Sequence, residues 1–249
     1  MVGTIPEDKY YVTVEEVIDW LGLRRYYGGT IPTSVENRVK MYIEFAMGKV
    51  DRLTATTWNG RRKICYEWHD ITKYKGGWWF GVGVPIFLTK MDLDPNIGKD
   101  GVLVLEVFNG VQYDNWAEKF EPRRMTGYWW VDPQEGIVFI NTFVFWQGGK
   151  EIRVKYVYGR DDLPNTIKEL TLLYVARDLL ATERLAVTVP TGGQTLDFGG
   201  MINYIDRRIR ELENMHMAVH IATMGKVLEE VEYDPETGEI ITVGKDTSN

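Results

Sequence analysis

The sequence has almost no cysteine, and it has no hydrophobic run as long as a membrane span. Cys65 is the single cysteine among 249 residues, which excludes an internal disulfide framework. No segment approaches the roughly 18–20 uninterrupted apolar residues that cross a bilayer. The first ten residues carry Glu7, Asp8 and Lys9 and lack the apolar core of a signal peptide. We therefore expect a protein without a membrane segment that is made in a cytoplasm.

The sequence also lacks an excess of positive charge. It holds 29 Lys and Arg residues against 36 Asp and Glu residues, which gives a net charge of −7. Free-standing nucleic-acid-binding proteins normally carry a basic surface, so this balance argues against such a role. The negative charge does not argue against a channel protein through which DNA passes without being bound. Hydrophobic residues (44%) and charged residues (26%) are close to the globular average, which excludes a disordered or collagen-like chain.

Two patterns resemble parts of metal sites, and both are incomplete. Asp92-Leu93-Asp94-Pro95-Asn96 begins like a calcium loop, but Ile97 and Leu103 stand where such a loop needs glycine and a bidentate glutamate. His216 and His220 are four residues apart on an expected helix, yet the His-Glu-x-x-His order is missing. We expect Asp92–Asn96 to be a polar turn and His216 and His220 to lie on a polar helix face, with no metal site at either.

Nucleotide-binding and nucleophile motifs are missing as well. Gly81-Val82-Gly83 lacks the third glycine of a Rossmann loop, because Ile86 stands there, and no Walker loop occurs. There is no Gly-x-Ser-x-Gly, and Cys65 lies in an apolar, strand-like context. Acidic residues are plentiful, but their spacing does not single out a glycosidase pair. The sequence thus predicts no catalytic residue and no cofactor.

Helical signals lie towards both ends of the chain. Thr13-Val14-Glu15-Glu16 is a capping box, and Thr33-Ser34-Val35-Glu36 repeats the pattern. Apolar residues then recur at helical spacing. Pro164 opens a third such segment, since proline in the first turn of a helix loses no hydrogen bond. We predict four helices, at 14–21, 34–52, 164–184 and 197–220.

The middle of the chain predicts strands. Asn59-Gly60 and Asn109-Gly110 lie between strand-like runs, and both residue types tolerate the positive φ of a type I′ hairpin turn. Val, Ile, Tyr, Phe and Trp dominate these runs, as in antiparallel sheets. We therefore predict an α+β fold, in which a helical body of about four helices carries an inserted antiparallel β region and a C-terminal extended arm or hairpin. The expected parts are 1–52 and 160–225 for the helices, 53–159 for the β region and 226–249 for the arm.

Tryptophan is frequent, and it occurs in adjacent pairs. Trp78-Trp79 and Trp129-Trp130 lie on expected strands, where neighbouring side chains point to opposite faces. Some of these rings should therefore leave the core, and exposed aromatic rings are typical of protein interfaces and of sugar-binding platforms. We expect a subunit interface that contains Trp78, Trp79, Trp129 and Trp130. The alternatives are a plain core and a carbohydrate-binding surface.

The last stretch of the chain predicts a short hairpin. Pro235–Gly238 is a turn between two strand-like runs, 228–233 and 240–243. Two isolated strands bury too little apolar surface to be stable in water, so we expect the hairpin to need another surface. Strand addition to the sheet of a partner would provide it, and the alternative is packing against the chain's own domain. The residues expected to bind the partner are Val231, Tyr233, Ile240, Ile241 and Val243.

Two stretches resemble the head–tail connector (adaptor) proteins of tailed phages and tailed archaeal viruses. Residues 11–22 and the helix that ends in Ala46–Thr54 are similar to the family's short helix and to its longer helix with the pattern A-x-x-x-V-D-x-x-T. Val154–Gly159 and the segment from Pro164 are similar to the family's final V-x-Y-x-Y-G strand and its Pro-capped helix. The resemblance covers about half of the chain, on both sides of a β region that is longer than in compact members.

The resemblance implies a non-enzymatic virion protein. Members of the family form a ring, for which we expect twelvefold symmetry, under the portal protein at the capsid vertex, and their C-terminal segment docks into the portal. The implied partners are the portal protein, a tail completion or neck protein and further copies of the chain, with DNA passing unbound through the lumen. The implied location is the virion neck, after synthesis in the host cytoplasm. A carbohydrate-binding or baseplate-type virion module and a cryptic hydrolase are the competing interpretations.

Overall fold

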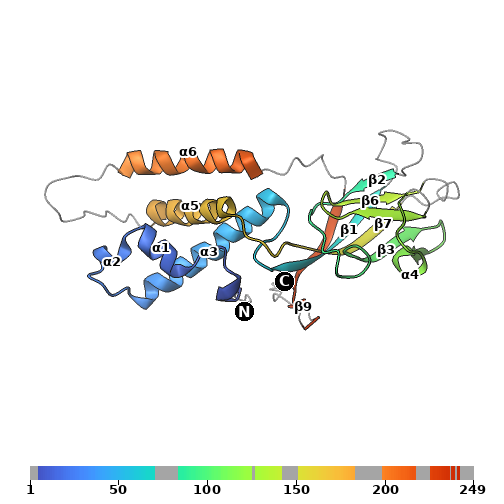
Figure 1. Ribbon diagram of the computed structural model, residues 1–249, viewed down its shortest axis with the longest axis horizontal. Helices are drawn as coiled ribbons and strands as arrows, with labels where there is room; N and C mark the ends of the chain where they lie inside the picture. Colours follow the sequence, from blue (N-terminus) through green and yellow to red (C-terminus); the bar gives the residue numbers. More distant parts are fainter. Residues whose placement is uncertain are drawn as a thin grey trace, which may run out of the picture. The chain divides into compact units, whose positions relative to one another are not determined.

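The chain folds into two compact units, which are described separately (Figure 1). The computed structural model describes residues 5–70, 84–124, 127–141, 151–182, 198–216, 225–235, 237–238 and 240–241. The helical unit spans residues 4–54 and 162–218, and the β unit spans residues 1–3, 55–161 and 219–249. The chain therefore leaves the helical unit after residue 54, returns to it at residue 162, and ends in the β unit.

Four helices of seven or more residues lie in the described part of the helical unit. They are α1 (Val14–Trp20), α3 (Thr33–Thr54), α5 (Asn165–Thr182) and α6 (Phe198–His216); the shorter η1 (Glu7–Lys9) and α2 (Leu23–Tyr26) flank α1. The capping box is confirmed, since the Thr13 hydroxyl accepts from the N–H of Glu16 and the Glu16 carboxylate accepts from the N–H of Thr13. All four predicted helices are confirmed, while residues 183–184, 197 and 217–220 of the predicted ranges lie outside the described residues.

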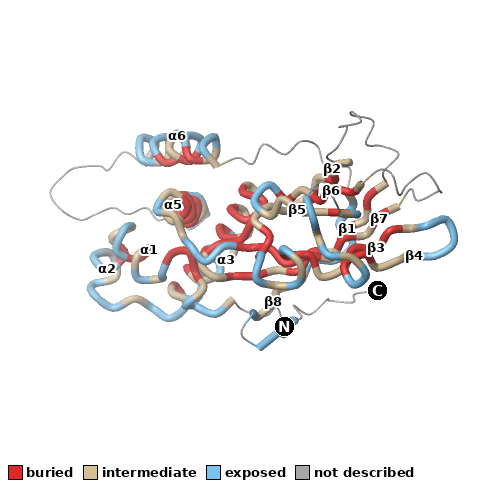
Figure 2. The backbone as a smooth tube through the Cα atoms, turned by 45° about the vertical axis from the view of Figure 1, so that its right-hand side comes forward, coloured by how far each residue is buried: buried red, intermediate tan, exposed pale blue. Residues whose placement is uncertain are grey.

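The central helix of this unit is α5. Buried residues lie around most of its circumference, because α5 contacts α1, α3 and α6 (Figure 2). By contrast, α6 buries one stripe, which contains Ile205, Ile209 and Leu212. Charged side chains join the two helices: Arg208 pairs with Glu169 at 2.7 Å. No helix in the part of the chain that the structure describes is long and apolar enough to cross a bilayer.

The described residues of the β unit form two antiparallel sheets (Figure 1). One sheet has the strand order β4-β3-β7-β1-β8-β9, and the other has the order β2-β6-β5. The strands are β1 (Arg62–Asp70), β2 (Val84–Phe87), β3 (Val102–Phe108), β4 (Tyr113–Asn115), β5 (Trp129–Asp132), β6 (Ile137–Ile140), β7 (Glu151–Tyr158), β8 (Lys226–Tyr233) and β9 (Ile240–Ile241), and the short helix α4 (Trp116–Lys119) follows β4. The predicted α+β class with an antiparallel β region is confirmed.

Buried residues of both sheets form one hydrophobic cluster in the β unit. Figure 2 shows the buried stretches of these strands in red. Alternation along β5 and β6 places Trp129, Val138 and Ile140 in the cluster. The six-stranded sheet contributes Leu105 from β3 and Val154 from β7. The hydrophobic strands of the middle region therefore share a single core.

The two Asn-Gly signals have different outcomes. Asn59 and Gly60 both have positive φ (59° and 69°), and the N–H of Arg61 donates to the carbonyl of Trp58, as a type I′ turn requires. This turn leads into β1, but the described residues before it are not a strand. Asn109-Gly110 does connect a hairpin, which pairs β3 with β4. At the second signal Gly110 has a positive φ of 97° but Asn109 does not, and the N–H of Asn109 donates to the carbonyl of Gln112, so this loop is not the expected type I′ turn. The first signal therefore predicts its turn but not a hairpin, whereas the second predicts the hairpin but not the type of turn.

The C-terminal hairpin is present, and it has a second pairing that its sequence does not reveal. As predicted, β8 pairs with β9, at Glu232 and Tyr233. In addition β8 pairs with β1, in an antiparallel register with an irregularity between Tyr66 and Glu67. The hairpin does need another surface, as expected, and for β8 that surface is the sheet of its own domain, the alternative to strand addition on a partner. Because β1 pairs with it, β8 forms its backbone hydrogen bonds within one chain.

Candidate functional site

The structure separates the tryptophans expected at a subunit interface. Trp129 is 0% exposed and lies in the core of the β unit, so its assignment to an interface is corrected. The reason is strand alternation, which turns Trp129 inward on β5 and Trp130 towards the opposite face. Trp78 and Trp79 lie outside the described residues. Trp130 is the member of the group that the structure places on an outward strand face.

Trp130 is half-buried and already contacts side chains of its own chain. Its ring stacks on Phe139, its register partner on β6, with centroids 3.7 Å apart and planes 3° from parallel. The Arg124 guanidinium lies 5.2 Å from the centre of the Trp130 ring. Pro85 on β2 pairs in register with Phe139. The outer face of the three-stranded sheet thus carries a row of apolar side chains, in which Phe139 already covers one face of the indole.

The other predicted contact residues lie on the C-terminal hairpin. Val231 and Tyr233 are half-buried on β8, and Ile240 on β9 is 45% exposed. Ile241 belongs to the backbone of β9, while Val243 lies outside the described residues. Tyr233 pairs in register with Ile240. The structure therefore gathers the described members of this set on one short two-stranded ribbon.

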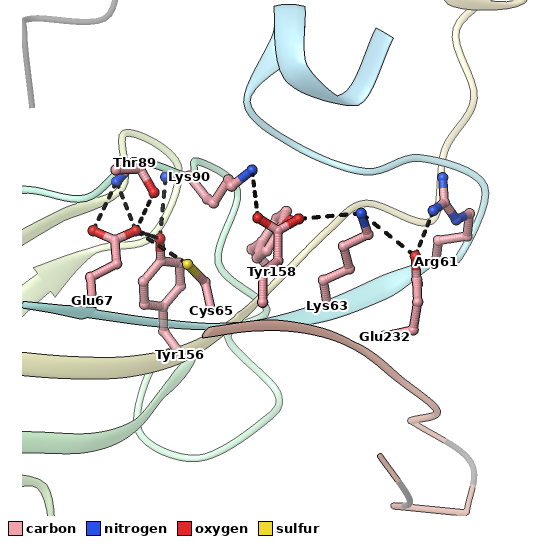
Figure 3. Close-up of polar contacts among 10 residues, drawn as sticks. Arg61, Lys63, Cys65, Glu67, Thr89, Lys90, Tyr156, Tyr158 and Glu232 are labelled. Carbon is pink, nitrogen blue, oxygen red and sulfur yellow. Dashed lines mark hydrogen bonds and ion pairs between the residues drawn. The ribbon is translucent and has the colours of Figure 1, made fainter. Parts of the chain in front are cut away.

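A buried polar cluster on β1 is a feature that the sequence analysis missed (Figure 3). Glu67 and His69 have side chains that are 0% exposed, and His69 Nε2 lies 3.0 Å from Glu67 Oε2. The Glu67 carboxylate also accepts hydrogen bonds from the N–H and hydroxyl of Thr89, from the Tyr156 hydroxyl and from the Cys65 thiol. These donors offset the unfavourable burial of a carboxylate.

Hydrogen bonding decides the charge state of this cluster. Burial by itself raises the pKa of Glu67, but hydrogen bonds from His69, Thr89 and Tyr156 outweigh it, and the pKa lies below its ordinary value. Burial raises the pKa of Tyr156 well above its ordinary value, and the Glu67 charge adds to the effect. Burial likewise raises the pKa of the Cys65 thiol. Glu67 is therefore ionised at neutral pH, whereas the Cys65 thiol keeps its proton and is not an activated nucleophile.

A row of ion pairs lies between β8 and the rest of the β unit (Figure 3). Glu230 lies 3.3 Å from Lys63 Nζ and 3.0 Å from Lys90 Nζ. Glu232 lies 2.7 Å from the Arg61 guanidinium and 3.6 Å from Lys63 Nζ. Burial raises the pKa of Glu230, but the positive charges of Lys63 and Lys90 outweigh it and lower the pKa. Glu230 and Glu232, two of the three glutamates of β8, are thus matched with cations.

Part of the buried polar cluster around Glu67 is detectable in the sequence. Cys65, Glu67 and His69 alternate along one strand, so they share one face of β1. A glutamate on the inward face of such a strand is the detectable sign of a buried polar cluster. Thr89 and Tyr156 are distant in the chain and reach Glu67 only through the folded sheet. No local pattern identifies these two residues.

In the two segments that resemble parts of metal sites, Asp94 and His216 contact protein groups. Asp94 is buried and lies 2.7 Å from the Arg62 guanidinium, and its carboxylate accepts from the N–H of Asn96, so this segment is the polar turn that the sequence predicts. His216 Nε2 lies 2.8 Å from the hydroxyl of Thr166, while His220 lies outside the described residues. Within the described ranges, no group of three or more His, Cys, Asp or Glu residues is arranged to hold a metal ion.

Negative charge is concentrated at the C-terminus of the chain. Residues 226–249 contain seven acidic residues and two lysines, a net charge of −5 out of −7 for the whole protein. A partner surface that complements this segment is basic.

Comparison with known proteins gives a distant structural likeness. No protein-family model matches the chain, and no curated protein matches it. Among solved structures, a chain described as "Neck of empty GTA particle computed with C6 symmetry" has a TM-score of 0.39 and is 15% identical, over 83% of this chain and 92% of that chain. A likeness of this strength does not by itself identify a function.

Proposed function

We propose that this chain is a structural protein of a viral neck. In this proposal it is an adaptor that forms a ring with copies of itself between the portal and the tail, with DNA passing through the lumen. The observation that carries the proposal is where the connector-like motifs lie in the fold. They are far apart in sequence, yet they fall on α1, α3 and α5, which pack together in the helical unit, and on β7, the strand that precedes α5.

In the first motif, Ala46–Thr54, each fixed residue is buried or hydrogen-bonded in the helical unit. Ala46 and Val50 are buried on α3. Asp51 is also buried, and its carboxylate accepts a hydrogen bond from the Tyr11 hydroxyl. The Thr54 hydroxyl donates to the carbonyl of Val50, 3.0 Å away. The pattern A-x-x-x-V-D-x-x-T is thus built into the packing of the helical unit, which supports the resemblance.

The second motif has the same property. Its Val and Tyr residues alternate on the inward face of β7, and all three are buried: Val154, Tyr156 and Tyr158. Gly159 has a φ of 134°, and a Cβ at this position would overlap the carbonyl oxygen of Arg61. Only glycine fits this exit from the strand. The pattern V-x-Y-x-Y-G is therefore explained residue by residue, which again supports the resemblance.

We assign no catalytic step to the buried cluster. Glu67, His69 and Tyr156 are 0% exposed, and their polar atoms are engaged with one another. A substrate would have to displace the core of the β unit to reach them. Their role in this proposal is to stabilise the unit.

We place one ring contact on the outer face of the three-stranded sheet. A cyclic ring needs two different surfaces on each subunit, and half-exposed aromatic side chains are favoured in such contacts. Trp130 and Phe139 provide them here.

We place the portal contact on the C-terminal segment, beyond β8. Ile240 offers an exposed apolar side chain, and residues 234–249, with four acidic residues and one lysine, carry a net charge of −3 that suits a basic groove in the portal. Since β8 already pairs with β1, the segment that is left to add to a partner's sheet begins after Tyr233.

Truncation after Tyr233 tests this placement. The variant keeps β8 and its ion pairs but lacks Ile240, Ile241 and Val243, so we expect its Tm to stay within ~2 °C of the full chain. It should fail to bind portal rings in a pull-down assay. The control is Leu228→Ser on the exposed part of β8, which should change neither property. Undiminished portal binding by the truncated chain would contradict the placement. Truncation after Lys226 is a poorer test, because it also removes β8, one of the two strands that pair with β1.

A further inference from the structure

The strand β8 buries little apolar surface in the unit that it completes. Each of its eight residues is exposed or half-buried, and Val227 and Leu228 are 39% and 45% exposed. On the other side of β1, β7 buries Ile152, Val154 and Tyr156 completely. Apolar burial is the main favourable term that holds a strand on a sheet. The attachment of β8 therefore depends on other interactions.

Those interactions are backbone pairing with β1 and the row of ion pairs. The Glu230 side chain is 29% exposed and its partners Lys63 and Lys90 are 18% and 14% exposed, while Arg61, the partner of Glu232, is 5% exposed, so the row is largely buried. Removing one member of such a pair leaves a buried charge without its partner. The edge of β1 therefore requires a strand that carries these two carboxylates, whichever copy of the chain supplies it.

The edge of β1 beneath β8 is a docking surface with a definite chemistry. It accepts one antiparallel strand that carries two carboxylates, two residues apart, opposite Lys63, Lys90 and Arg61. The residue before the strand must also be glycine, because a Cβ at Gly225 would overlap the ring of His69. The β8 segment of a second copy of this chain has the same two carboxylates and the same preceding glycine, so it fits this edge equally well.

We propose that, in the assembled ring, β8 pairs with β1 of the neighbouring copy and forms there the backbone and ion pairs that it forms within one chain in this structure. The inference rests on the proposed function, since it needs ring neighbours. Every pairing that is broken within a chain is formed again between chains, so the exchange costs little and links every subunit to the next.

Disulfide trapping between two different variants tests the exchange. Cys65→Ser removes the native thiol, and in that background Ile64→Cys and Val231→Cys are placed in separate chains. Ile64 and Val231 are register partners of β1 and β8, and both substitutions leave Glu230 and Glu232 in place. The two variants are mixed under reducing conditions, assembled into rings, oxidised and separated on a non-reducing gel. A disulfide between the two variants forms only if β8 of one chain lies against β1 of the other.

We expect a disulfide-linked dimer of about 58 kDa, twice the mass of the chain. Val227→Cys in place of Val231→Cys is the out-of-register control and should give much less dimer, and a chain that carries both Ile64→Cys and Val231→Cys is the positive control. Rings without a mixed dimer, together with closure of the disulfide inside the doubly substituted chain, would overturn the exchange but leave the proposed ring intact. A protein that stays monomeric would contradict the ring, and the exchange with it.

Discussion

A single fully buried carboxylate organises the interior of the β unit. Glu67 accepts hydrogen bonds from Thr89, Tyr156 and Cys65 and lies 3.0 Å from His69. These partners come from β1, from β7 and from the segment after β2, so one side chain joins three parts of the unit. In a low-dielectric interior such a group is favourable only while its partners remain in place.

Glu67→Gln should therefore lower the free energy of unfolding by about 2–4 kcal/mol. The amide keeps the shape of the side chain, but it loses the charge and turns a donor towards the donors of Thr89 and Tyr156. The matched control is Glu106→Gln, since Glu106 is partly exposed and accepts from the Tyr66 hydroxyl; it should lose less than about 1 kcal/mol. Urea denaturation measures both variants, and equal losses would contradict this role of Glu67.

Gly159→Ala should lower the free energy of unfolding by about 2–4 kcal/mol. Alanine disfavours a φ of 134°, and its Cβ would overlap the backbone carbonyl of Arg61, which has little freedom to move. Gly28→Ala is the control: Gly28 also has a positive φ, of 68°, but no atom lies within 4 Å of an added Cβ, so the loss should be about 1 kcal/mol. If thermal melts gave the two variants the same stability, the steric account of Gly159 would be wrong.

Local signals determine which residue features are predictable from the sequence. The Thr13–Glu16 capping box and the Asn59-Gly60 turn are predictable because each depends on four consecutive residues. Adjacent tryptophans show that a strand has two aromatic faces, but they do not show which face is the core, so Trp129 could not be told from Trp130. The partners of Glu67 meet only in the folded sheet and are not predictable in this way.

At the scale of elements, the helices and most strands follow from periodicity. Two runs rich in Val, Ile, Phe and Tyr, at 137–145 and 151–158, predict strands, and β6 and β7 begin at the first residue of each run, while 142–145 lie outside the described residues. The pairing of β8 with β1 does not follow, because a register between strands more than a hundred residues apart depends on the whole sheet rather than on either strand. The same limit explains why the sequence could not decide between a partner's sheet and the chain's own sheet as the surface that β8 joins.

Acid should weaken the attachment of β8. Burial raises the pKa of Glu230, but Lys63 and Lys90 outweigh it, so the pKa in the folded protein lies below the ordinary 4.5. A carboxyl group whose pKa is lowered by folding stabilises the fold above its unfolded pKa, and this contribution is lost as the pH falls through the folded pKa. Below pH 4.5 the ion pairs to Lys63 and Lys90 are therefore lost progressively.

Hydrogen exchange measures this effect. After correction for intrinsic rates, the protection of β8 amides relative to β7 amides should fall when the pH is lowered from about 6 to about 3.5. The β7 strand is the internal control, because apolar burial holds it in the core. An unchanged ratio of protection would contradict an electrostatic attachment.

At the scale of the whole molecule, the two units carry different features that support the proposed function. The helical unit carries most of the residues that resemble head–tail connectors, and the β unit carries the outward aromatic face and the acidic C-terminal segment. The α+β class is predictable from the change in periodicity along the chain. A ring and its symmetry are properties of several copies together, so the sequence of one chain does not predict them. One chain shows only the surfaces that are available for such contacts, such as the outer sheet face around Trp130.

The mass of the protein in the presence of portal rings tests most directly whether this chain forms a portal-bound adaptor ring. Sedimentation and native mass spectrometry should show an added mass of about 346 kDa on each portal ring, twelve times the 28.8 kDa of the chain. Trp130→Ser should reduce the ring-bound fraction while the far-ultraviolet circular dichroism stays unchanged. A chain that remains a 28.8-kDa monomer and leaves the mass of the portal ring unchanged would contradict the account.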